Sequence, residues 1–198
     1  MTVRPVPALG VALALVAALG SAMQAQPREF ARVRSLGRAL VEYNDGPTRV
    51  VAAYYYYSQL SHDSAWLLVE IGVASPQPTT VRRTEIDLVT PSGRVVALAS
   101  QRRWGGDSTR ARLLLQQAQT TRHQVRSYFR EADGSEALRF FTRPEDGGTV
   151  IDAVQTVPEQ VLLGDLMFES PTGAWERGRY ALNLRYELGT ASLPIDLK

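Results

Sequence analysis

The sequence contains no cysteine, two histidines and a single lysine, Lys198. Without cysteine there is no disulfide framework, no thiolate nucleophile and no lipid anchor on an N-terminal cysteine. Two histidines alone are a poor ligand set for zinc. The acidic turns at 133–136 and 145–148 lack the alternating Asp/Asn spacing of a calcium-binding loop. We therefore expect no metal site and no cofactor.

The sequence also lacks a strong charge of either sign and any catalytic signature. It has 22 Lys and Arg against 20 Asp and Glu, a formal net charge of +2. A charge this small gives no general case for nucleic acid binding. There is no nucleophile elbow, zinc-protease helix, phosphate loop or dinucleotide fingerprint. Ser61-His62-Asp63-Ser64 places catalytic residue types side by side, but these are ordinary turn residues.

No uncharged apolar run reaches the roughly 20 residues of a membrane span. The longest, Ala8–Leu19, follows Arg4 and precedes several small residues. This is the pattern of a secretory signal peptide over residues 1–25. Cleavage after Ala22 and cleavage after Ala25 both fit the pattern, and an uncleaved anchor is the alternative.

Residues 26–198 are expected to form one exported domain, periplasmic or extracellular, with no transmembrane span. The whole chain is 44% hydrophobic and 21% charged, a composition typical of globular proteins.

Two adjacent runs are expected to form the central β-hairpin. Val50–Tyr57 consists of β-branched, aromatic and alanine residues, which suit a pleated strand. Trp66–Val73 alternates with period two, and Glu70 marks one of its faces as the wetter one.

The facing of the tyrosines depends on the turn that joins these runs. A two-residue turn at His62-Asp63 pairs Tyr54 with Ile71 on the core face and directs Tyr55 and Tyr57 outward. A loop one residue longer or shorter would reverse these faces.

Short strand signals separated by turns continue through most of the chain. They predict strands at 79–89, 94–99, 137–142, 149–157, 161–169, 179–188 and 191–197. This pattern is typical of a β-sandwich or a β-barrel, and we expect a mainly β fold, an antiparallel β-sandwich.

Residues 107–130 interrupt the β pattern with a predicted helical insertion. Asp107 or Ser108 is suited to cap a helix. An apolar stripe at helical spacing would cover one face or end of the sheet. Its members are Leu114, Ala118, Val125 and Phe129.

Gly178-Arg179-Tyr180 resembles the corner of immunoglobulin-like and fibronectin-type sandwiches. In those folds a tyrosine hydroxyl bonds back to the preceding loop. The resemblance covers about a dozen residues, implies an Ig-like fold and transfers no functional residue. The helical insertion is a departure from that family.

Two surface sites are predicted. The first is an aromatic platform for a glycan or protein of the cell envelope, formed by Tyr55, Tyr57 and Trp66 on the outer face of the hairpin. The second is an anion-binding surface formed by the arginines in and near the insertion. Its members are Arg102, Arg103, Arg122 and Arg126.

The predicted function is an exported, non-catalytic binding or structural protein. One alternative is an envelope hydrolase whose acidic residues converge only in three dimensions. Another is a peripheral binder of anionic envelope surfaces through the arginine-rich region 102–130. A core that covers the aromatic rings, and a solvated arginine face, are the simpler interpretations of the two sites.

Overall fold

The structure is a computed structural model that describes residues 32–54, 64–119, 125–142, 149–187 and 189–197. The described strands are β1 (Val33–Gly37), β2 (Leu40–Asn44), β3 (Arg49–Ala53), β4 (Trp66–Ala74), β5 (Thr80–Arg82), β6 (Ile86–Val89), β7 (Val95–Ala97), β8 (Gly134–Leu138), β9 (Ala153–Gln155), β10 (Gln160–Glu169), β11 (Gly178–Tyr186) and β12 (Gly189–Leu197). The described helical segments are η3 (Arg83–Glu85), α2 (Gln101–Gly106), α3 (Ser108–Gln119) and η4 (Val125–Tyr128). The mainly β prediction is confirmed.

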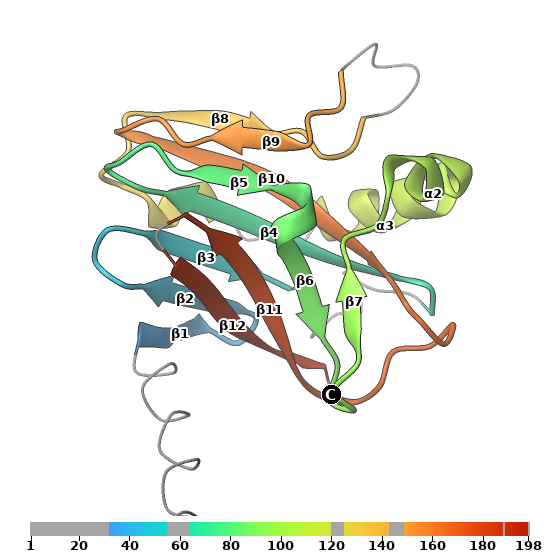
Figure 1. Ribbon diagram of the computed structural model, residues 1–198. Coiled ribbons are helices and arrows are strands. Elements are labelled where there is room, and N and C mark those ends of the chain that lie inside the picture. Colours follow the sequence, from blue (N-terminus) through green and yellow to red (C-terminus); the bar gives the residue numbers. More distant parts are fainter. Residues whose placement is uncertain (1–31, 55–63, 120–124, 143–148, 188, 198) are drawn as a thin grey trace, which may run out of the picture.

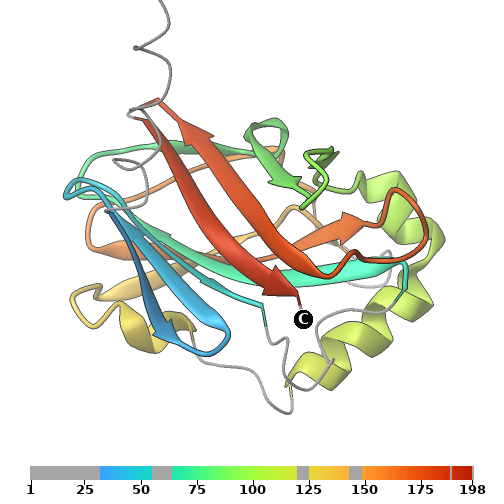
Figure 2. The same cartoon turned by 90° about the horizontal axis from the view of Figure 1, so that it is seen from below.

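Two larger sheets face each other and form a sandwich (Figures 1 and 2). The six-stranded sheet has the order β1-β2-β3-β4-β10-β8, and the four-stranded sheet has the order β12-β11-β6-β7. A small third sheet pairs β5 with β9. The ladders are antiparallel except for β8 and β10, which are parallel. These two strands are joined through β9, which belongs to another sheet, so the chain returns to β10 in the direction of β8.

The main core lies between the two larger sheets, and β11 shows how the sequence builds it. Tyr180, Leu182 and Leu184 are buried in this core, whereas Asn183 and Arg185 face away and are more exposed. This is the period-two alternation expected of a strand with one buried face. The predicted strand at 179–188 is therefore present, over Gly178–Tyr186.

β3 and β4 are antiparallel neighbours, as predicted, but the predicted register differs from the observed register by two residues. Ile71 lies opposite Ala52, not opposite Tyr54. Because the side-chain period of a strand is also two, this shift leaves each residue on its predicted face. Tyr54 is accordingly buried in the core between the sheets. The predicted turn at His62-Asp63 lies outside the described residues.

β4 is buried on both faces, which corrects the expectation of a wetter outer face. Every residue from Trp66 to Val73 is buried, Glu70 included. α2, α3 and η4 pack on the face of this sheet that is turned away from the four-stranded sheet. The chain that follows β7 therefore supplies a third layer.

The helical insertion is present, but it begins earlier than predicted and covers two separate areas of the sheet. Ser100 caps α2 by accepting a hydrogen bond from the backbone N–H of Arg103 at 3.2 Å. Leu114 of α3 packs in one apolar cluster with Trp66. Val125 and Phe129, in and after η4, pack in another. The residues predicted to form one apolar stripe therefore pack in two separate clusters.

The corner hydrogen bond expected at Tyr180 is present. The hydroxyl of Tyr180 donates to the carbonyl oxygen of Glu176 at 2.8 Å. Gly178 has a φ of +137°, and a Cβ there would approach Pro91 to 2.9 Å. Glycine is therefore needed for both backbone conformation and space. This bond is a feature of one corner and does not show a family by itself.

Candidate functional site

Trp66 is buried, so the prediction of an exposed ring at this position is wrong. Its side chain is 0% exposed. Its indole Nε1 donates to Asp107 Oδ2 at 2.8 Å, and the Arg103 guanidinium lies 5.7 Å from the ring centroid. Trp104 and α3 complete the apolar cluster around it. Trp66 therefore anchors the helical layer to the sheet and offers no face to a ligand.

Several predicted residues lie outside the described ranges. These are Tyr55 and Tyr57 of the aromatic platform and Arg122 of the anion surface. The two histidines, His62 and His123, which belong to neither predicted site, also lie outside these ranges.

The three described arginines of the predicted anion surface have different environments. Arg102 is exposed on α2. Arg103 is ion-paired with Glu169 at 2.6 Å, and the hydrogen bond to this carboxylate raises the arginine pKa. Arg126 donates to the carbonyl oxygens of Phe129 and Ala132, both at 2.5 Å. Two of these three guanidinium groups are thus engaged within the fold.

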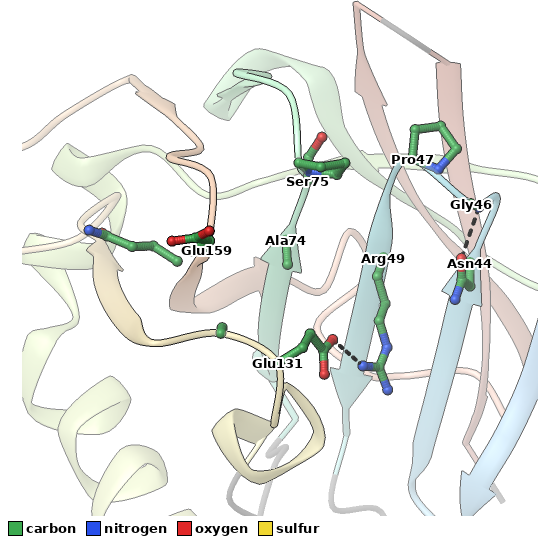
Figure 3. Close-up of a pocket in the computed structure, with 11 residues that line it drawn as sticks. Asn44, Gly46, Pro47, Arg49, Ala74, Ser75, Glu131 and Glu159 are labelled. Carbon is green, nitrogen blue, oxygen red and sulfur yellow. Dashed lines mark hydrogen bonds and ion pairs between the residues drawn. The ribbon is translucent and has the colours of Figure 1, made fainter.

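A cavity of about 370 Å³ lies at one end of the six-stranded sheet (Figure 3). We call it the edge cavity. The β2–β3 turn, the end of β4, the segment after η4 and the start of β10 all contribute to its wall. The lining residues are Asn44, Gly46, Pro47, Arg49, Ala74, Ser75, Pro76, Glu131, Ala132, Glu159 and Gln160. This volume is within the range of small-molecule sites, which begins at roughly 300 Å³.

An ion-pair network holds one wall of the edge cavity. Arg49 Nη1 donates to Glu131 Oε1 at 2.6 Å, and Arg49 Nε donates to Glu42 Oε1 at 2.5 Å. Arg34 pairs with the other oxygen of Glu42. The Arg49 guanidinium also lies 5.1 Å from the centroid of the Phe129 ring, which is within cation–π distance. Figure 3 shows Arg49 and Glu131 directed toward each other.

This network keeps its carboxylates ionised. Burial opposes the charge on Glu42, but the hydrogen bonds from Arg34 and Arg49 outweigh burial and lower the Glu42 pKa. Burial also opposes the charge on Glu131, yet its own backbone N–H and Arg49 lower the Glu131 pKa. Both groups therefore present fixed negative charge near neutral pH.

Glu159 occupies a strained position on the opposite wall. Its φ is +65°, and no other non-glycine residue of the described ranges has a positive φ. Its carbonyl oxygen accepts from the backbone N–H of Asp133 at 2.7 Å. Within the described part of the chain, no cationic group pairs with its carboxylate. The edge cavity thus carries two carboxylates and one guanidinium, a net negative charge, between walls of alanine and proline.

Only part of this site has a signal in the sequence. The segment Asn44-Asp45-Gly46-Pro47 has the composition of a turn, and Asn44 Oδ1 accepts from Gly46 N at 2.9 Å. Glu131 and Glu159 carry no such signal. The positive φ of Glu159 cannot be predicted from its residue type. In the described ranges, no group of three or more Asp, Glu or His side chains is placed to hold a metal ion.

The fold and the edge cavity together define a mainly β, sandwich-type protein with a ligand-sized acidic cavity at the end of a sheet. No family model matches the sequence. No curated protein matches it either. Among solved structures, the chain is similar to the yjhA protein from Bacillus subtilis. The TM-score is 0.36 at 10% sequence identity, over 72% of this chain and 76% of that chain.

None of the helices in the described ranges is both long enough and apolar enough to cross a lipid bilayer.

Proposed function

We propose that this chain is an exported, non-catalytic binding protein, and that its edge cavity takes a positively charged group on an apolar stem, such as a lysine side chain of an envelope protein. The observation that carries this proposal is the pairing of a net negative cavity with apolar walls. An alkylammonium group would place its charge near Glu159 and Glu131 and its methylenes against Ala74 and Pro47.

The ionisation state of the cavity favours binding over hydrolysis. A hydrolase with two carboxylates needs one of them protonated to act as general acid. Glu131 has a lowered pKa and is held by Arg49. It is therefore a poor proton donor near neutral pH, although it is well suited to attract a cation.

Export and an immunoglobulin-like fold are part of the same proposal. The charged and apolar pattern of residues 1–25 supports a signal peptide, which would lead to a periplasmic or extracellular protein. The bond from Tyr180 to the Glu176 carbonyl supports the resemblance to immunoglobulin-like and fibronectin-type sandwiches. Localisation is tested by fractionating cells that produce the tagged protein and determining the N-terminus of the mature chain.

The binding test compares Glu159→Gln with a matched control, Glu136→Gln, which alters an exposed glutamate on β8 away from the cavity. Affinity capture from an envelope fraction should recover the partner with wild type and Glu136→Gln, and several-fold less with Glu159→Gln. Equal capture by all three folded proteins would show that the edge cavity does not bind the partner. Capture that fails only in Tyr55→Ala/Tyr57→Ala would assign binding to the tyrosine run instead.

A small probe tests the ligand chemistry directly. In a ¹H–¹⁵N titration, n-butylammonium should shift the backbone signals of Ala74, Glu131 and Glu159 in a saturable manner. The neutral analogue n-butanol should shift them several-fold less, because it lacks the charge. Identical shifts with both probes would show that charge does not drive binding at this cavity.

A further inference from the structure

Positive charge is concentrated in one segment of the chain. Residues 101–130 contain seven arginines and one acidic residue, Asp107, so this segment carries a formal charge of +6. The whole chain carries +2, so all other residues together carry −4. A basic segment in an otherwise acidic chain indicates an anionic partner for that part of the surface.

α2 and α3 expose part of this charge, because their apolar side chains face the sheet. Trp104 and Leu114 are buried in one cluster with Trp66. Asp107 is also directed at the sheet, since its Oδ2 accepts from Trp66 Nε1. The exposed cations of the two helices are Arg102, Arg103 and Arg110. Figure 2 shows both helices along one edge of the molecule, in yellow-green, so these arginines are accessible from solvent at that edge.

Leu113 of α3 adds an apolar side chain to this basic surface. It is 53% exposed. Arg110 lies three residues earlier on the same helix, so the two side chains share a face. An exposed leucine beside arginines is typical of a helix that lies in a membrane interface, where the apolar side chain enters the headgroup region and the cations contact lipid phosphates. We call Arg102, Arg103, Arg110 and Leu113 the cationic helix surface.

We propose that the cationic helix surface docks this protein on a bilayer that contains anionic phospholipid. Charge complementarity favours an anionic partner, and Leu113 favours a bilayer, because a soluble polyanion offers no apolar layer to receive it. The docking surface differs from the anion surface predicted from the sequence. It adds Arg110 and Leu113, and it leaves out Arg126, which donates to two backbone carbonyl oxygens.

Docking through the helices leaves the edge cavity at the far end of the sheet. Trp66, which packs against the helices, is the first residue of β4, and Ala74, which lines the edge cavity, is the last. At about 3.3 Å per residue, these two residues lie roughly 26 Å apart along the strand. The docked protein can therefore bind a second partner in the edge cavity, and neither site depends on the other.

The test is co-sedimentation of the protein with vesicles of phosphatidylglycerol and phosphatidylcholine in equal amounts. Wild type should bind these vesicles about tenfold more tightly than vesicles of phosphatidylcholine alone, and added salt should weaken the binding by screening the charges. Arg102→Gln/Arg110→Gln should weaken binding about 25-fold, since each arginine near an anionic surface contributes about fivefold. Arg103 is left unchanged because it is paired with Glu169.

The control for charge is Arg94→Gln, which alters an exposed arginine between β6 and β7 and should leave vesicle binding unchanged. Equal binding of wild type to both kinds of vesicle, or an equal loss in the control and the double variant, would overturn the proposal. If the double variant does not fold, Arg102→Gln alone should still weaken binding about fivefold.

Leu113→Ser distinguishes a bilayer from a soluble polyanion. It should weaken vesicle binding several-fold, because it removes an apolar side chain from the interface, and it should leave heparin binding unchanged. Val95→Ser is the control, since Val95 is 62% exposed on β7. Unchanged vesicle binding by Leu113→Ser would overturn the bilayer as the partner. Glu159→Gln should bind vesicles as wild type does, so a failure of the edge cavity is distinguishable from a failure of this surface.

Discussion

The hydroxyl of Tyr186, on β11, donates to Asp45 Oδ2 at 3.0 Å and thereby connects the four-stranded sheet to the β2–β3 turn of the six-stranded sheet. Tyr43 donates to the same carboxylate oxygen at 3.3 Å. Burial, followed by the charges and hydroxyls nearby, raises the pKa of Tyr186 above its ordinary value of 10.0. Tyr186 therefore stays protonated and keeps this bond throughout the physiological range.

Tyr186→Phe should lower the free energy of unfolding by about 1–2 kcal/mol, because it removes a half-buried hydrogen bond to a carboxylate. Chemical denaturation monitored by circular dichroism measures the change. Tyr128→Phe is the control, since the Tyr128 hydroxyl makes no hydrogen bond within the described ranges. If both variants lose the same stability, the connection between the sheets contributes nothing of its own.

Acid should destabilise the protein through Glu42. Its folded-state pKa lies below the ordinary value of 4.5. A carboxyl group shifted in this direction contributes stability that is complete above the unfolded pKa and is lost as pH falls through the folded pKa. The unfolding free energy should therefore drop below about pH 4.5.

Glu42→Gln separates this group from the other carboxylates. At pH 7 it should cost about 2–3 kcal/mol, because Arg34 and Arg49 lose a charged partner that is 1% exposed. Its stability should also decline less steeply with acid than that of wild type. Parallel pH profiles for the two proteins would contradict this assignment.

Gly72→Ala should loosen η4 from the sheet. A Cβ at this position would lie 2.5 Å from Phe129 Cε2 and 2.8 Å from Val125 Cγ1, so the covering segment must shift. The expected cost is about 1–3 kcal/mol, typical of an overpacked core. Hydrogen exchange should increase in residues 125–132. Gly37→Ala is the control, because nothing lies within 4 Å of a Cβ there.

Glu159→Gly should stabilise the protein while weakening the edge cavity. Relief of the left-handed backbone at φ +65° should add about 0.5–1 kcal/mol. Loss of the carboxylate should reduce n-butylammonium affinity several-fold. Thermal unfolding and the ammonium titration are measured on the same samples. A variant that is less stable than wild type would mean that the glutamate side chain supports the fold and not a ligand.

Much of the architecture follows from local pattern. The alternation along β11 is set by which side chains avoid water, and the strand forms as that pattern predicts. The β3–β4 pairing follows from two neighbouring β-prone runs. The Tyr180 corner follows from glycine and tyrosine at a fixed spacing. Each of these features depends on residues that are close in sequence.

What the sequence by itself determined is therefore the class of fold: a mainly β, cysteine-free sandwich with a helical insertion. Tertiary structure alone decided that Trp66 is covered, because its burial depends on α3, more than 40 positions further along the chain. It also decided the edge cavity, whose walls bring together Asn44 and Glu159 from distant parts of the chain. Periodicity indicates only whether a side chain is buried or exposed. It does not show which distant segment covers a buried side chain.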